Sequence, residues 1–124
     1  MTPYVLMYAR DDVATTHDWQ QLPTGAHVEA AVDGFRMLAD ATRLRMMWLL
    51  CGAEYDVTTL AAAVGIARPA VSQHLAKLKL AGLVSVRREG RRAVYRVRGG
   101  HVRRLLAEAV ETADHHLTGR PDHD

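Results

Sequence analysis

The chain has 124 residues, of which 48% are hydrophobic and 24% charged, and its formal net charge is +2. This length allows one domain with a modest core, and the composition favours a folded, soluble protein over a disordered chain. No apolar run approaches the roughly 20 residues needed to cross a bilayer, and residues 4–8 are too short and lack the basic lead of a signal peptide, so we expect a cytoplasmic protein.

Three regions are predicted along the chain. Residues 1–24 show neither helical nor strand periodicity, and we expect them to form an N-terminal arm that is mobile or packed on a partner. Residues 25–116 show regular periodicity throughout and are predicted to form the folded domain of the chain. Residues 117–124 follow as a C-terminal tail that contains further polar side chains.

Two helices are predicted at the start of the regular region. Apolar residues recur at three- and four-residue steps over residues 27–39, which indicates an amphipathic helix. Asp40 or Thr42 can cap a second helix that ends near Gly52. We expect one side of this second helix to face the core, since a Met and Trp stripe is more often core than cofactor site. The residues on that side are Leu44, Met47, Trp48 and Cys51.

A short helix and a basic helix follow, separated by a glycine turn. Asp56 or Thr58 can cap the short helix, and Gly65 provides the left-handed residue that ends it. Pro69 is compatible with the first turn of the next helix, which is predicted over residues 68–81. Two helices joined by a tight turn are typical of a helix-turn-helix.

A two-stranded hairpin and a last helix complete the regular region. Apolar and polar residues alternate on both sides of residues 89–91, whose sequence Glu-Gly-Arg is typical of a turn. Apolar residues at helical spacing then predict a helix over residues 101–116. The predicted fold is therefore mostly α with a small β-hairpin, in the order α-α-α-α-β-β-α, which is that of a winged helix-turn-helix.

Basic residues are concentrated in one part of the chain. Residues 68–104 contain eleven Lys or Arg and one acid, Glu89, whereas the remainder contains five bases and thirteen acids. A local positive surface can neutralise the phosphates of a duplex, although a charge run alone is equally compatible with a solvated surface. Its location on the basic helix and the hairpin favours DNA binding.

Polar residues on the basic helix and the hairpin are candidates for contact with DNA. Val71, Leu75 and Leu78 are expected to face the core, which turns the polar residues between them toward a major groove. Gln can bond adenine in a bidentate way, Ser and Lys can reach bases or phosphates, and arginines at a hairpin tip can contact phosphates or the minor groove. The predicted DNA-binding residues are Arg68, Ser72, Gln73, His74, Lys77, Arg91 and Arg92, with a place in the core as the alternative for His74.

Several segments of the chain resemble the ArsR/SmtB family of bacterial metal-responsive repressors. The specific features are Leu-Ala-Asp-x-Thr-Arg within residues 35–44 and Ser-x-His within residues 70–78, and the resemblance covers roughly residues 27–116. It implies a homodimer that is paired largely through the first and last helices. It also implies that the apo-dimer binds an inverted-repeat operator and leaves it when an inducer binds. No catalytic motif is present, so an enzyme is not expected.

Histidines and carboxylates are concentrated in the last helix and the tail. The chain has a single cysteine, Cys51, and the positions of the family's thiolate site hold Asp56 and Thr58, so a soft-metal thiolate site is not expected. His101 and His115 lie on nearly the same helix face but about 21 Å apart, so one chain cannot close a site, whereas two antiparallel last helices could. The pattern resembles the family's nickel- and cobalt-sensing branch. The ligands that this resemblance implies are His101, Asp114, His115 and His123, with His116 and Asp124 as less favoured additions.

The sequence leaves the inducer open in several respects. The zinc-type pattern of the family requires an aspartate and a histidine where Gly99 and Thr112 stand, so we predict Ni(II) or Co(II), with Zn(II) as the alternative. His115 and His116 could instead be a C-terminal pair favoured by the helix dipole. The sequence is also compatible with a regulator that responds to a non-metal or redox signal, or with one that has no inducer.

Overall fold

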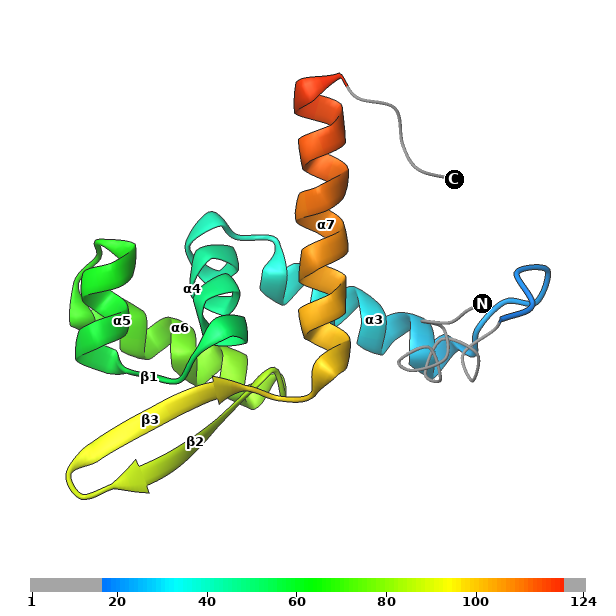
Figure 1. The fold of residues 1–124 in the computed structure, drawn as a ribbon. Coiled ribbons are helices and arrows are strands. Elements are labelled where there is room, and N and C mark those ends of the chain that lie inside the picture. The colour runs from blue at the N-terminus through cyan, green and yellow to red at the C-terminus, as the bar shows by residue number, and fades with distance from the viewer. Residues whose placement is uncertain (1–16, 120–124) are drawn as a thin grey trace. The chain divides into compact units, whose positions relative to one another are not determined.

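A computed structural model describes residues 17–119 of the chain (Figure 1). Most of the predicted N-terminal arm and the end of the tail, with the predicted ligand His123, lie outside the described residues. The described residues belong to two units, residues 17–30 and residues 31–119. Within the described range, no helix is both long and apolar enough to span a membrane.

The order of elements over residues 17–119 follows the predicted one, and each predicted helix boundary lies within two residues of the observed one. The elements are α3 (Gly25–Leu38), α4 (Ala41–Gly52), β1 (Tyr55–Asp56), α5 (Val57–Val64), α6 (Arg68–Leu80), β2 (Val84–Glu89), β3 (Arg92–Val97) and α7 (Gly100–Thr118). The two-residue strand β1 is an addition to the prediction, since a segment this short shows no periodicity in sequence.

Aspartate side chains start α4 and α5. The Asp40 carboxylate accepts the backbone N–H of Arg43 at 2.9 Å, and the Asp56 carboxylate accepts that of Thr59 at 2.8 Å. Because these hydrogen bonds favour the charged carboxylate, they lower the pKa of both aspartates. In each helix the aspartate, rather than the alternative threonine, is the observed cap.

The core of the second unit lies where α4, α5, α6 and α7 meet the sheet. The largest fully buried side chains are Met46, Met47, Leu50, Leu60, Leu75, Leu78, Leu106, Val71 and Val84. The inward orientation predicted for the apolar residues of α6 is confirmed. The prediction for α4 was wrong for Trp48, which is 47% exposed. Core positions on a helix recur at three and four residues, and α4 uses Met46, Met47 and Leu50 for this purpose, which leaves Trp48 outside the buried stripe.

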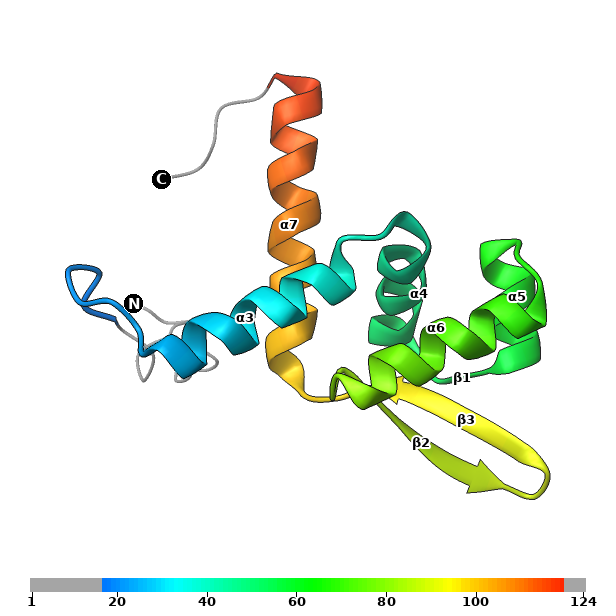
Figure 2. The same cartoon turned by 180° about the vertical axis from the view of Figure 1, so that it is seen from behind.

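The sheet is antiparallel, with the order β1-β3-β2. Strands β2 and β3 pair from Val84 opposite Val97 to Glu89 opposite Arg92, so Gly90 and one further residue form the turn. The φ of Gly90 is 65°, in the left-handed region that such a turn requires. The turn projects beyond α6 in both views (Figure 1, Figure 2), so the predicted wing is present.

Candidate DNA interface and metal ligands

Helices α5 and α6 form a helix-turn-helix. Gly65 ends α5 with a φ of 75°, and its N–H donates to the carbonyl oxygen of Ala61 at 2.8 Å. Helix α6 begins after Ala67, and Pro69 occupies its first turn, where no intrahelical hydrogen bond requires an N–H. These local preferences bring α6 back across α5 and leave one side of α6 outside the core.

The outer side of α6 presents Ser72, Gln73 and Lys77, which are all exposed. Gln73 and Lys77 are four residues apart and therefore neighbours on the helix surface. Their amide and ammonium groups are suited to base edges and phosphates in a major groove. The structure thus places these three predicted residues on one accessible face.

A polar hollow lies at the start of α6. It is lined by Val57, Thr58, Arg68, Pro69 and Ser72. The Arg68 guanidinium donates to the hydroxyl oxygen of Thr58 at 3.3 Å, which holds the charge beside the N-terminus of α6. Hydroxyl groups, a guanidinium and the positive end of a helix together suit a backbone phosphate.

His74 has a different environment from the other predicted DNA-binding residues of α6. It is half-buried, and its Nδ1 lies 3.4 Å from Nη1 of Arg43, a residue near the start of α4. The sequence places Arg43 in the Leu-Ala-Asp-x-Thr-Arg stretch but does not predict its contact with α6, because that contact joins segments 31 residues apart.

Ion pairs distinguish the arginines of the hairpin. Arg92 lies 3.0 Å from a Glu89 carboxylate oxygen and 3.5 Å from one of Asp56. Arg87 lies 2.9 Å from a carboxylate oxygen of Glu54 and 3.1 Å from one of Glu89. Much of the positive charge of these two side chains is therefore balanced within the protein.

The arginines nearest the turn are placed differently. Arg88 and Arg91 are exposed, and within residues 17–119 neither forms an ion pair or hydrogen bond with another side chain. Arg91 was predicted to bind DNA, whereas Arg88 was not chosen. The sequence could not separate Arg88 from Arg87, because the acids that engage Arg87 include Glu54 from just before β1.

The predicted metal ligands lie along α7. His101 is exposed in the first turn, and its Nδ1 lies 3.0 Å from Nη2 of Arg104. His115 is only 8% exposed, and its Nε2 lies 3.9 Å from a Glu111 carboxylate oxygen. Asp114 is half-buried, and His116 is exposed.

One chain does not bring these ligands together. With a rise of about 1.5 Å per residue, His101 and His115 are about 21 Å apart along α7. In the part of the chain that the structure describes, no group of three or more His, Cys, Asp or Glu side chains is close enough to hold a metal ion. Imidazole and carboxylate donors nevertheless match the preference of Ni(II) and Co(II) for nitrogen and oxygen ligands.

Cys51 lies in a different environment from these donors. It is half-buried and packs against the core. Burial raises the pKa of its thiol, because it disfavours the thiolate. Cys51 therefore packs at the edge of the core, and not within it as the sequence predicted.

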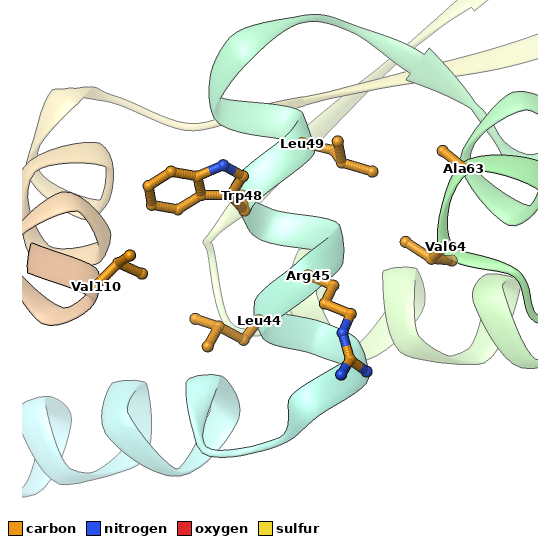
Figure 3. A pocket seen from close by; sticks show the side chains of 7 residues that line it. All are labelled: Leu44, Arg45, Trp48, Leu49, Ala63, Val64 and Val110. Carbon is orange, nitrogen blue, oxygen red and sulfur yellow. The ribbon is translucent and has the colours of Figure 1, made fainter. Parts of the chain in front are cut away.

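An apolar hollow lies between α4, α5 and α7. In Figure 3, Leu44 and Trp48 extend from α4 toward Val110 of α7. The other residues that line it are Arg45, Leu49, Ala63 and Val64. Large apolar side chains are also exposed elsewhere on the helices, namely Val32 and Phe35 of α3 and Leu105 of α7. Exposed large apolar side chains are candidates for a protein interface.

Comparisons with known proteins agree with this architecture. Residues 40–86 match the family described as bacterial regulatory protein, arsR family. The chain is 50% identical over 92 residues to the HTH-type transcriptional regulator KmtR of Mycobacterium tuberculosis. These 92 aligned residues make up 74% of this chain and 71% of KmtR.

Two solved structures are similar in fold and sequence. One is the homodimeric winged helix-turn-helix DNA-binding domain of a possible ArsR-family transcriptional regulator from Mycobacterium bovis, with 34% identity, a TM-score of 0.73, and coverage of 90% of this chain and 99% of that chain. The other is the AntR antimony-specific transcriptional repressor, with 32% identity, a TM-score of 0.73, and coverage of 79% and 89%.

Proposed function

From the premise that the chain belongs to the ArsR family of bacterial regulatory proteins, we propose that it is a metal-responsive repressor released from its operator by Ni(II) or Co(II). Family membership makes the chain a DNA-binding transcriptional regulator and not an enzyme. The observation that supports the DNA-binding part of the proposal is the exposed polar face of α6 beside a hairpin whose tip residues Arg88 and Arg91 have no ion-pair partner within residues 17–119. The metal-binding part rests on the imidazole and carboxylate donors of α7 and on the similarity to KmtR.

The proposed DNA interface has two parts. Ser72, Gln73 and Lys77 enter a major groove, where Gln73 reads a base. Arg68 at the start of α6 and Arg91 at the tip of the hairpin contact phosphates, which position the protein without selecting sequence. Two other residues that the sequence predicted to bind DNA, His74 and Arg92, are in contact with protein groups. Arg92 must give up an acidic partner to reach DNA, and His74 faces Arg43 within the protein.

We propose that two copies of the chain form the operator-binding species. The exposed apolar side chains of α3 and α7 supply a surface whose burial would stabilise such a pair. The similar domain from Mycobacterium bovis is homodimeric. A two-fold pair presents two reading helices, as an inverted-repeat operator requires.

The proposed inducer site combines ligands from both copies. Pairing of α7 helices in antiparallel orientation would bring His101 of one copy toward His115 of the other. Asp114, His116 and His123 complete the proposed donor set, and Zn(II) is the alternative ion. When bound, the ion would supply bonds between the two chains. Release from DNA then requires that it bind the DNA-free geometry more tightly than the DNA-bound one.

The test starts from a duplex that the wild-type apo-protein selects from a random library. We expect Ni(II) or Co(II) to lower affinity for this duplex, and His101→Ala to abolish that effect while affinity without metal is unchanged. His101 is exposed, so its replacement does not disturb the core. Glu108→Ala on the exposed surface of the same helix is the matched control and should respond to metal as wild type does.

Different results would identify a different regulator. Release by Zn(II) alone would replace the proposed ion. Release only after thiol oxidation, or under no condition, would show a redox-responsive or constitutive regulator. Failure to select any duplex would contradict DNA recognition itself.

A further inference from the structure

Arg43 contacts three separate parts of the fold. Its backbone N–H donates to the Asp40 carboxylate at 2.9 Å, and its Nε donates to the carbonyl oxygen of Met37 at 2.6 Å. Its Nη1 lies 3.4 Å from Nδ1 of His74. The first two contacts attach Arg43 to the junction of α3 and α4, and the third reaches α6, 31 residues further along the chain.

The contact with Arg43 determines which ring nitrogen of His74 accepts a hydrogen bond and which one carries the proton of the neutral ring. A guanidinium can only donate, so Nδ1 must accept and the proton of the neutral ring resides on Nε2. Exposed neighbours on α6, such as Gln73, point away from the core, whereas His74 is half-buried. The Nδ1 edge of the ring therefore faces the protein rather than a groove of DNA.

A directional contact between Arg43 and His74 can restrict the rotation of α6 about its own axis, which core packing restricts less. The buried apolar residues of α6 hold it against the core through contacts that depend little on direction. A polar contact with a guanidinium that is itself fixed to Met37 depends on direction, and we expect it to constrain the rotation of α6 about its axis. That rotation decides which side chains meet the bases.

We infer that Arg43 and His74 are positioning residues that hold the reading helix α6 against the α3–α4 junction, with His74 acting through Nδ1 and not by reading a base. This inference rests on the proposed DNA-binding function. It also gives α3, one of the helices proposed to pair in the dimer, a direct polar link to α6 through the carbonyl of Met37.

Two amide substitutions separate the roles of the ring nitrogens. His74→Asn places an acceptor oxygen near the position of Nδ1, whereas His74→Gln places its amide near the position of Nε2. The measurement is the ratio of affinities for the wild-type-selected duplex and for a scrambled duplex. We expect His74→Asn to retain the wild-type ratio and His74→Gln to lower it about tenfold, the effect of losing one hydrogen bond to a charged group.

Arginine-to-lysine changes test the other partner without changing charge. Arg43→Lys cannot satisfy both Met37 and His74, so we expect it to lower the same ratio about tenfold. Arg45→Lys is the matched control, because Arg45 lies on the same helix, is exposed and makes no ion pair within residues 17–119. It should leave the ratio unchanged.

A spectroscopic readout remains informative even if a variant fails to fold. In the imidazole nitrogen spectrum of the wild-type protein without DNA, the neutral ring of His74 should carry its proton on Nε2 and not on Nδ1. The opposite tautomer would overturn the inference. So would a loss of selectivity in folded His74→Asn, or wild-type selectivity in Arg43→Lys. If the wild-type protein selects no duplex, the proposed function fails instead.

Discussion

Removal of one arginine at the hairpin tip should change the salt dependence of DNA binding by a predictable amount. Each phosphate that a cation neutralises contributes about 0.9 to the slope of log affinity against log salt concentration. Arg91 is exposed in the turn with no ion-pair partner within residues 17–119. Arg91→Ala should therefore reduce the magnitude of the slope by about 0.9 per chain, or about 1.8 for a dimer that uses both wings.

The matched control is Arg96→Ala on the same hairpin. Arg96 lies 3.9 Å from a Glu54 carboxylate oxygen and away from the turn, so its removal changes net charge equally but should leave the slope nearly unchanged. Fluorescence anisotropy titrations of a labelled duplex at several salt concentrations give the slopes. Because phosphate contacts carry no sequence information, Arg91→Ala should weaken selected and scrambled duplexes alike. An unchanged slope for Arg91→Ala, or an equal change for Arg96→Ala, would refute the reasoning.

Three further predictions concern α6 and the helix caps. Gln73→Ala should weaken binding to the selected duplex by roughly 1–3 kcal/mol and relax the preference at one base position. Competition with single-base variants of the duplex measures this preference, and equal losses of affinity on every variant would contradict a base contact. Leu75→Ala should lower the free energy of unfolding by about 2–5 kcal/mol in urea denaturation, because Leu75 is fully buried. The control is Leu80→Ala at a position 91% exposed, which should change the free energy of unfolding by less than about 0.5 kcal/mol. Because hydrogen bonds lower the pKa of Asp40 and Asp56 in the folded chain, their contribution to stability is fully present above the unfolded pKa of about 3.9 and is lost as pH falls through the folded values. Urea denaturation at several pH values below 5 should show Asp56→Asn with a shallower acid dependence than wild type, and an identical dependence would count against the cap.

Much of the helix-turn-helix could be predicted because its signals are local. Gly65 and Pro69 act through the backbone conformations that each residue allows, and Asp56 caps α5 by accepting the N–H of Thr59, three residues away. The inward face of α6 follows from apolar residues at helical spacing. All of these depend on neighbours within one or two turns of chain, so the sequence reports them directly.

The candidate site could be predicted only in part. The exposed positions of Ser72, Gln73 and Lys77 follow from the period of α6. The roles of the hairpin arginines do not, because Arg87 and Arg92 find acidic partners on or beside β1. The metal ligands predicted on α7 remain a prediction, because the proposed site takes ligands from two copies of the chain and forms only when they pair.

The sequence by itself determined where helices begin and end, which face of α6 is buried, and where the positive charge lies along the chain. Only the tertiary structure decided that Trp48 is half exposed, that β1 joins the hairpin, and that Arg43 meets His74. The physical reason is the separation along the chain over which each kind of interaction acts. Backbone preferences and helical periodicity act between near neighbours, whereas ion pairs, strand pairing and polar contacts between helices depend on how distant segments pack.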